Sequence, residues 1–136
     1  MSAIRQWILA ALAIFGAFIA AGICGSIATD LLGLWNRPGA GFCAASAVVV
    51  STYVAVPHHR SLLACCAFGL GAAVAWVLLE PSWYPENYGA QGYEPTHLPI
   101  IATYVSGLLG LAAAGIHRLR SGPNNSSKPT PLRGAA

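Results

Sequence analysis

The chain has 136 residues, of which 56% are hydrophobic and only 8% are charged. An ordinary soluble domain carries about 25% charged residues, and a domain this small leaves much of its surface in water, so the composition excludes a soluble fold and indicates an integral membrane protein. The net charge is +3, but the Lys and Arg residues are scattered without the basic and aromatic patch of a nucleic-acid-binding protein. We therefore expect the lipid bilayer, and no nucleic acid, as a partner.

The first apolar segment, residues 7–29, contains no charged residue and no His, Asn or Gln. At about 1.5 Å per residue, a helix of this length crosses the ~30 Å hydrocarbon core. Arg5 and Trp7 stand at its start, where interfacial residues are common. We interpret the segment as a retained transmembrane helix. The alternative is a signal peptide cleaved after Ala28, but the apolar core is longer than most signal peptides carry.

Residues 30–39 form a short connection to the next apolar segment. Asp30 suits the N-cap of one turn of interfacial helix, with an ordinary turn as the alternative. Pro38 and Gly39 are expected to end this connection. The second apolar segment, residues 40–57, contains three consecutive Val residues that favour a strand, but no polar alternation accompanies them, so we predict a helix.

Residues 61–79 and 98–116 are the third and fourth predicted spans. The link 57–60 is so short that the second and third spans must form an antiparallel hairpin. Pro99 fits the first turn of the fourth helix, where its missing N–H is harmless. Pairs of small residues four positions apart recur in the spans, and such pairs let helix backbones approach closely. They are Gly16 with Ala20, Ala17 with Ala21, Ala21 with Gly25, and Ser106 with Gly110.

One long polar segment, residues 80–97, lies between the third and fourth spans. It holds three of the four acidic residues and no Lys or Arg. Its Pro and Gly residues argue against a long helix within it. It also carries four aromatic residues of the types that anchor at membrane interfaces and populate binding hot spots. These are Trp83, Tyr84, Tyr88 and Tyr93.

The predicted architecture is an all-α, integral membrane bundle of four transmembrane helices within residues 1–120, followed by a disordered tail at 121–136 that is rich in Ser, Pro, Asn and Gly. Four spans put both termini on one side. That side holds six of the seven Lys and Arg residues, and only Arg37 lies on the other. The positive-inside rule then predicts cytoplasmic termini and an extracytoplasmic segment 80–97.

The last nine residues, 128–136, resemble the tails of many short hypothetical bacterial proteins. The resemblance covers only these residues, implies a bacterial origin and a tail without function, and says nothing about the four spans. Together with the four predicted spans, a bacterial origin predicts a multi-pass protein of the inner (plasma) membrane.

Two groups of residues have the types that ligate metals. His58 and His59 precede Cys65 and Cys66, which are soft-metal ligands by type. On a continuous helix, however, His59 and Cys66 lie about two turns, or ~10 Å, apart. One metal ion cannot bridge that distance, so we predict no metal site here.

Glu94 and His97 have the spacing that places two metal ligands on one helical face. Pro95 lies between the two residues and Pro99 follows them, and these prolines argue against a regular helix through both Glu94 and His97. We interpret Glu94 and His97 as ordinary loop residues and predict no metal and no cofactor.

The cysteines have no C-x-x-C spacing, which excludes a zinc ribbon and a thioredoxin-like site. We expect them to be small apolar residues. Cys24 and Cys43 should lie at similar depth near the outer ends of the first two spans, so a disulfide between them is the alternative.

The spans hold no ionisable residue other than Cys and Tyr. Transporters that couple to protons or ions usually need one. Glu80 is followed directly by Pro81, so we expect it to mark the outer end of the third helix. No G-x-S-x-G elbow and no phosphate-binding glycine loop occurs. We therefore predict no catalytic residues and no enzyme activity.

These observations favour an accessory or structural membrane subunit whose segment 80–97 contacts a membrane-protein partner or the lipid headgroup layer. A homo-oligomer is also expected as a possible assembly. The alternative is a minimal oligomeric transporter or channel for a small solute.

Overall fold

The computed structural model describes residues 3–121 and contains four long helices. They are α1 (Ala3–Leu31), α2 (Asn36–Ala55), α3 (Arg60–Leu79) and α4 (Leu98–Arg120). Each is long and apolar enough to cross a membrane, which confirms the predicted set of four apolar helices. Between α3 and α4 lie the strand β1 (Ser82–Trp83), the 3-10 helix η1 (Glu86–Gln91) and the strand β2 (Pro95–Thr96). The predicted tail, apart from Ser121, falls outside the described residues.

Helix α1 runs two residues past the predicted end of the first span, so Asp30 lies inside α1. The interfacial helix with Asp30 as its N-cap is therefore wrong, and the connection is a turn. Gly33 has a φ of 67°, and the N–H of Leu34 donates to the carbonyl of Thr29 at 2.9 Å. This pattern is a Schellman motif, in which a glycine in the left-handed region satisfies the last carbonyls of the helix.

Helix α2 begins at Asn36, four residues before the predicted start at residue 40. Pro38 and Gly39 were expected to end the connection, but both lie in the first turn of α2. A proline is harmless there because the first N–H groups of a helix have no intrahelical acceptor. The other end of α2 is Ala55, and the backbone turns extended at Val56.

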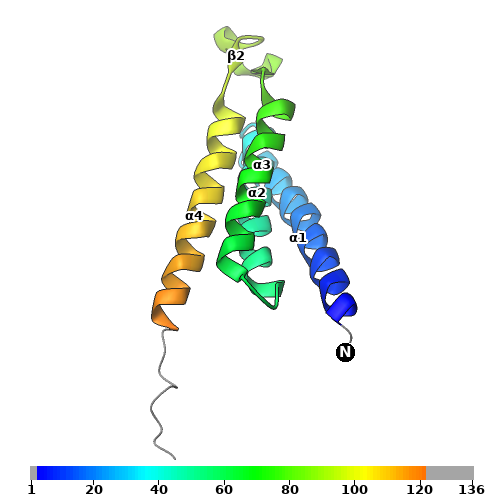
Figure 1. Ribbon diagram of the computed structural model, residues 1–136. Coiled ribbons are helices and arrows are strands. Elements are labelled where there is room, and N and C mark those ends of the chain that lie inside the picture. The colour runs from blue at the N-terminus through cyan, green and yellow to red at the C-terminus, as the bar shows by residue number, and fades with distance from the viewer. Residues whose placement is uncertain (1–2, 122–136) are drawn as a thin grey trace, which may run out of the picture.

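Helix α2 is the central helix, since α1, α3 and α4 all pack against it. Helix α1 makes most of its contacts with α2. In Figure 1, α1 leans away from α4, and α2 lies behind α3. Helices α1 and α2 approach closely at Gly25, where an added Cβ would lie 2.5 Å from the carbonyl oxygen of Gly39. The two backbones therefore touch at a point where both helices carry glycine.

The Ser106 and Gly110 pair makes the corresponding contact between α4 and α2. Ser106 is fully buried and its hydroxyl donates to the carbonyl of Phe42. An added Cβ at Gly110 would lie 3.2 Å from the Cβ of Val49. The predicted close packing is thus confirmed for this pair. The Gly16 and Ala20 pair, in contrast, is exposed on α1.

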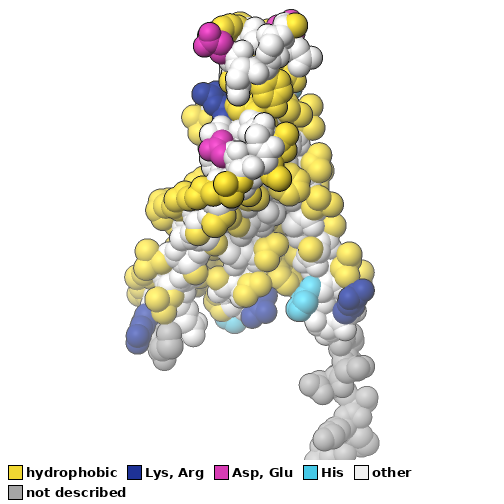
Figure 2. All heavy atoms as spheres, turned by 180° about the vertical axis from the view of Figure 1, so that it is seen from behind, with side chains coloured by type: hydrophobic (Ala, Val, Ile, Leu, Met, Phe, Trp, Pro, Cys, Tyr) yellow, Lys and Arg dark blue, Asp and Glu magenta, His cyan; other side chains and the backbone are white. Residues whose placement is uncertain are grey.

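The charged side chains lie at the two ends of the helices. In Figure 2, acidic side chains gather at the upper end and His side chains at the lower end. The N-terminus of α1, the link between α2 and α3 and the end of α4 all lie at the same end of the molecule, opposite the strands (Figure 1). Between the two ends, large apolar side chains are exposed along the helices, as on the face shown in Figure 2.

Candidate functional site

Residues 80–97 form a folded structure, here called the cap. Strands β1 and β2 pair antiparallel, with Ser82 opposite Thr96. Beyond them, the N–H of Tyr84 donates to the carbonyl of Glu94 at 3.0 Å, and the N–H of Tyr93 donates to the carbonyl of Tyr84 at 3.0 Å. The all-α prediction is therefore corrected by one two-stranded sheet. Strands of two residues are too short to produce a period-two pattern in a sequence.

Two aromatic rings of the cap pack against one ring from the turn between α1 and α2. The ring of Trp35, from the turn between α1 and α2, lies 5.5 Å from that of Tyr84 and 6.2 Å from that of Tyr88, measured between centroids. Tyr84 and Tyr88 stack at 5.1 Å. Offset and edge-to-face pairs of this kind contribute roughly 0.5–1.5 kcal/mol each beyond their buried area. The cluster fixes the cap to the start of α2.

The other two aromatic residues of the cap point outward. Trp83 is 51% exposed and Tyr93 is 65% exposed. Tyr93 also has a φ of 66°, in the left-handed region that side chains other than glycine rarely adopt. Glu86 and Glu94 are exposed on the same segment. Of the four aromatic residues in the cap, Tyr84 and Tyr88 therefore hold it in place. Trp83 and Tyr93 are exposed on its surface.

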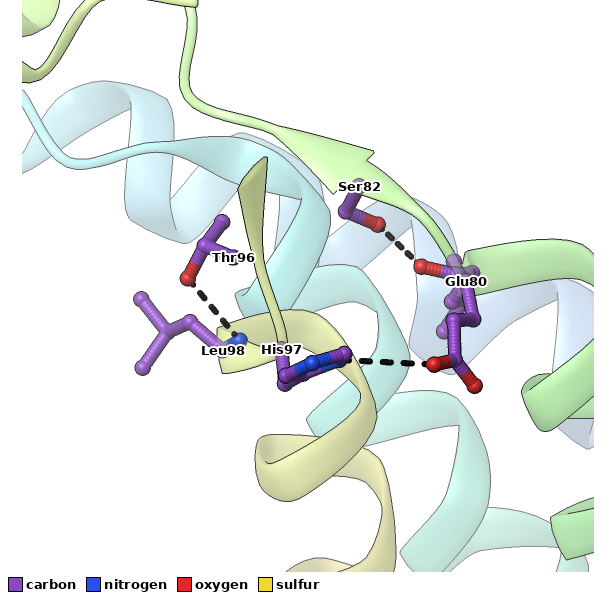
Figure 3. A network of polar contacts seen from close by, with 6 residues as sticks. Glu80, Ser82, Thr96, His97 and Leu98 are labelled. Atoms are coloured by element: carbon purple, nitrogen blue, oxygen red, sulfur yellow. Dashed lines mark hydrogen bonds and ion pairs between the residues drawn. The ribbon is translucent and has the colours of Figure 1, made fainter. Parts of the chain in front are cut away.

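At the base of the cap, residues at the end of α3 lie next to residues at the start of α4 (Figure 3). Glu80 caps the C-terminus of α3, as predicted. Its Oε1 lies 4.0 Å from Nδ1 of His97, and its Oε2 is buried with no hydrogen-bond partner among the described residues. The hydroxyl of Thr96 accepts the N–H of Leu98 at 3.2 Å. His97 therefore faces Glu80.

Within residues 3–121 there is no group of three or more His, Cys, Asp or Glu side chains that could hold a metal ion. His59 has a φ of 53° and immediately precedes α3, which carries Cys65 and Cys66 on its exposed surface. Glu94 lies between η1 and β2, and His97 lies at the start of α4. Neither of the two residue pairs considered as metal ligands lies on one regular helix.

All four cysteines are free thiols. Cys43 packs against α1 at Gly25, where an added Cβ would lie 2.8 Å from the Cβ of Cys43. Cys24 is exposed. The disulfide considered for Cys24 and Cys43 is not present in this structure.

Several hydroxyl groups within the helices donate to backbone carbonyls. Thr52 and Thr103 bond to the carbonyls four residues before them, Val48 and Pro99, at 2.7 Å. One described hydroxyl lies near a possible base, since the oxygen of Tyr53 is 3.5 Å from Nδ1 of His117 at the end opposite the cap. The sequence analysis missed this contact, because the two residues are 64 positions apart.

A groove of about 700 Å³ lies between α1 and α3, with α2 as its floor. Its lining is almost wholly apolar, and Arg37 is the one charged residue that lines it. The groove was also missed by the sequence analysis, since it depends on how α1 and α3 sit on α2.

Comparisons with known protein families, with curated proteins and with solved structures find no match to this chain.

Proposed function

We propose that this chain is a multi-pass protein of the bacterial inner (plasma) membrane, with both termini in the cytoplasm and the cap outside. Four apolar helices support this arrangement, as does the position of the start of α1 and the end of α4 at the same end of the molecule. Of the five Arg residues within residues 3–121, four belong to that end and only Arg37 belongs to the cap end, and this bias is the property that orients membrane proteins.

Within this topology, we propose a non-catalytic accessory or structural subunit that binds a partner membrane protein through the cap. The observation that carries the proposal is the outward placement of Trp83 and Tyr93 on a folded segment. Large aromatic side chains are the commonest binding hot spots. The stacked rings of Trp35, Tyr84 and Tyr88 hold the segment in place, so little conformational entropy is lost on binding.

The backbone conformation of Tyr93 also favours a binding role for the exposed surface of the cap. A left-handed conformation costs an L-residue roughly 1–2 kcal/mol, and such costs cluster at functional sites. Asparagine tolerates this conformation far better than tyrosine. A tyrosine at this position, with its ring exposed, therefore favours contact with a partner over a role in the stability of the cap.

The groove between α1 and α3 is apolar. It therefore offers no polar path for the alternative, a minimal oligomeric transporter or channel for a small solute.

The proposal is tested by placing a photoreactive phenylalanine at position 83 or 93 of the full chain and irradiating intact cells. We expect one cross-linked protein at both positions. The control is the same residue at position 7, an exposed tryptophan near the opposite end. Cross-links only to lipid at positions 83 and 93, or the same products at position 7, would contradict the proposal.

A second variant separates binding from folding. Tyr93→Asn should leave the cap as stable as before, or up to about 1 kcal/mol more stable, because asparagine relieves the left-handed strain. Recovery of the cross-linked partner by affinity purification should nevertheless fall about 30-fold, the effect of losing a hot-spot side chain. His59→Asn is the matched control, since His59 is the other non-glycine residue with a positive φ in the described chain and lies at the opposite end.

A further inference from the structure

The groove between α1 and α3 has the dimensions of an acyl-chain site. Its floor runs along α2 from Arg37 to Val49, and its walls include Phe18 of α1 and Leu78 of α3. Twelve residues of helix rise by about 18 Å, a little over half of the ~30 Å hydrocarbon core of a bilayer. The groove begins at the end of the molecule that carries the cap. It therefore spans the depth of a single leaflet.

The polar groups that line the groove, apart from Arg37, have partners inside the protein. The hydroxyl of Thr103 donates to the carbonyl of Pro99 at 2.7 Å, and the hydroxyl of Tyr104 donates to the carbonyl of Ala72 at 3.0 Å. Arg37 is exposed, and within residues 3–121 no acidic side chain lies within ion-pair distance of it. The groove thus combines an apolar lining with one exposed cation at the end that carries the cap.

We propose that this groove binds one glycerophospholipid from the leaflet on the cap side, with an acyl chain along α2 and the phosphate on Arg37. Arginine binds phosphate through two parallel N–H donors, which makes the contact strong and directional. The acyl chain adds a favourable contribution for every methylene that it buries. This inference depends on membrane insertion but not on whether the cap binds a partner protein.

Two neighbouring glycines on α3 provide a matched test of the apolar part. Gly71 lines the groove and Gly69 does not. Both are exposed, and an added Cβ at either meets no atom within 4 Å. Gly71→Leu and Gly69→Leu should therefore fold equally well. Only Gly71→Leu places a branched side chain in the groove.

The full chain, purified in mild detergent, is titrated with phosphatidylglycerol, and bound lipid is counted by native mass spectrometry. We expect one lipid per chain in the unaltered protein. Gly71→Leu should weaken binding at least tenfold, and Gly69→Leu should leave it unchanged. Equal binding by the two variants would overturn the proposal. So would a dimer that binds no lipid and dissociates in Gly71→Leu, because a second copy would then occupy the groove.

The headgroup contact is tested by Arg37→Gln, with Arg120→Gln as the control at the opposite end. Losing a charge-assisted contact should weaken phosphatidylglycerol binding about tenfold or more. Diacylglycerol with the same acyl chains lacks the phosphate, so its binding should be weaker and indifferent to Arg37→Gln. Equal loss of both lipids in Arg37→Gln, or equal loss in Arg120→Gln, would contradict the assignment of Arg37.

Discussion

The ring of Trp35 lies 5.5 Å from the ring of Tyr84, centroid to centroid, although the two residues belong to different connections between helices. Trp35 ends the short turn after α1, and Tyr84 follows the first strand of the cap. Their contact joins the two connections at that end of the molecule. It gives the cap a fixed position over α2.

The first prediction concerns this contact. Trp35→Ala removes both aromatic pairs of the Trp35 ring and should make local opening of the cap about 2 kcal/mol easier. Hydrogen exchange of residues 80–97 should then accelerate roughly 30-fold, because opening of the cap exposes the Tyr84 and Tyr93 amides that are now hydrogen-bonded. Exchange in the middle of α3 should not change.

Trp83→Ala is the control for that measurement, since Trp83 is exposed and takes part in no aromatic pair among the described residues. It should leave cap exchange within about twofold of the unaltered protein. Acceleration of the same size in both variants would mean that the Trp35 cluster does not hold the cap.

Much of the helical layout was predictable, because long runs without charge admit few alternatives to apolar helices. The third span, predicted at 61–79, differs from α3 by one residue. The start of α2 was predicted less well, since Pro38 and Gly39 usually mark a turn. Here the first turn of a helix tolerates proline, and the close approach to α1 requires glycine, so packing between helices decided the outcome.

The features of the candidate site were harder to predict. The pairing of Ser82 with Thr96 involves strands of two residues that leave no alternating pattern. The sequence identified all four aromatic residues of the cap as types that are common at interfaces. It could not show that two of them, Tyr84 and Tyr88, pack against Trp35. That division depends on a contact between segments about 50 residues apart.

The second prediction concerns the contact between α1 and α2. Gly25→Ala places a Cβ 2.5 Å from the backbone oxygen of Gly39, and backbone cannot move aside as a flexible side chain can. The free energy of unfolding, measured by titration with sodium dodecyl sulfate, should fall by about 1–3 kcal/mol.

Gly16→Ala on the same helix is the matched control, because an added Cβ at Gly16 meets no atom within 4 Å. It should leave the free energy of unfolding unchanged or raise it by up to about 1 kcal/mol, as alanine is the better helix former. If Gly25→Ala proves as stable as Gly16→Ala, α1 does not pack on α2 at Gly25.

The third prediction concerns Ser106, whose buried hydroxyl joins α4 to the carbonyl of Phe42 on α2. Ser106→Ala should lower the free energy of unfolding by about 0.6 kcal/mol and by no more than about 1.7 kcal/mol, the range for hydrogen bonds between membrane helices. Ser51→Ala should have almost no effect, because the Ser51 hydroxyl bonds within its own helix to Val48. Equal losses in the two variants would show that the hydrogen bond from Ser106 to Phe42 contributes nothing to stability.

The central claim is a chain of four membrane spans with the cap outside and both termini inside. It is tested most directly by attaching a membrane-impermeant maleimide to single cysteines, in a chain whose four native cysteines are replaced by alanine. Asn87→Cys lies in the cap and Ser121→Cys directly after α4, and both positions are exposed. We predict that intact cells label Asn87→Cys, and that Ser121→Cys reacts only after permeabilisation. Labelling of Asn87→Cys only after permeabilisation, or of both positions in intact cells, would contradict this topology.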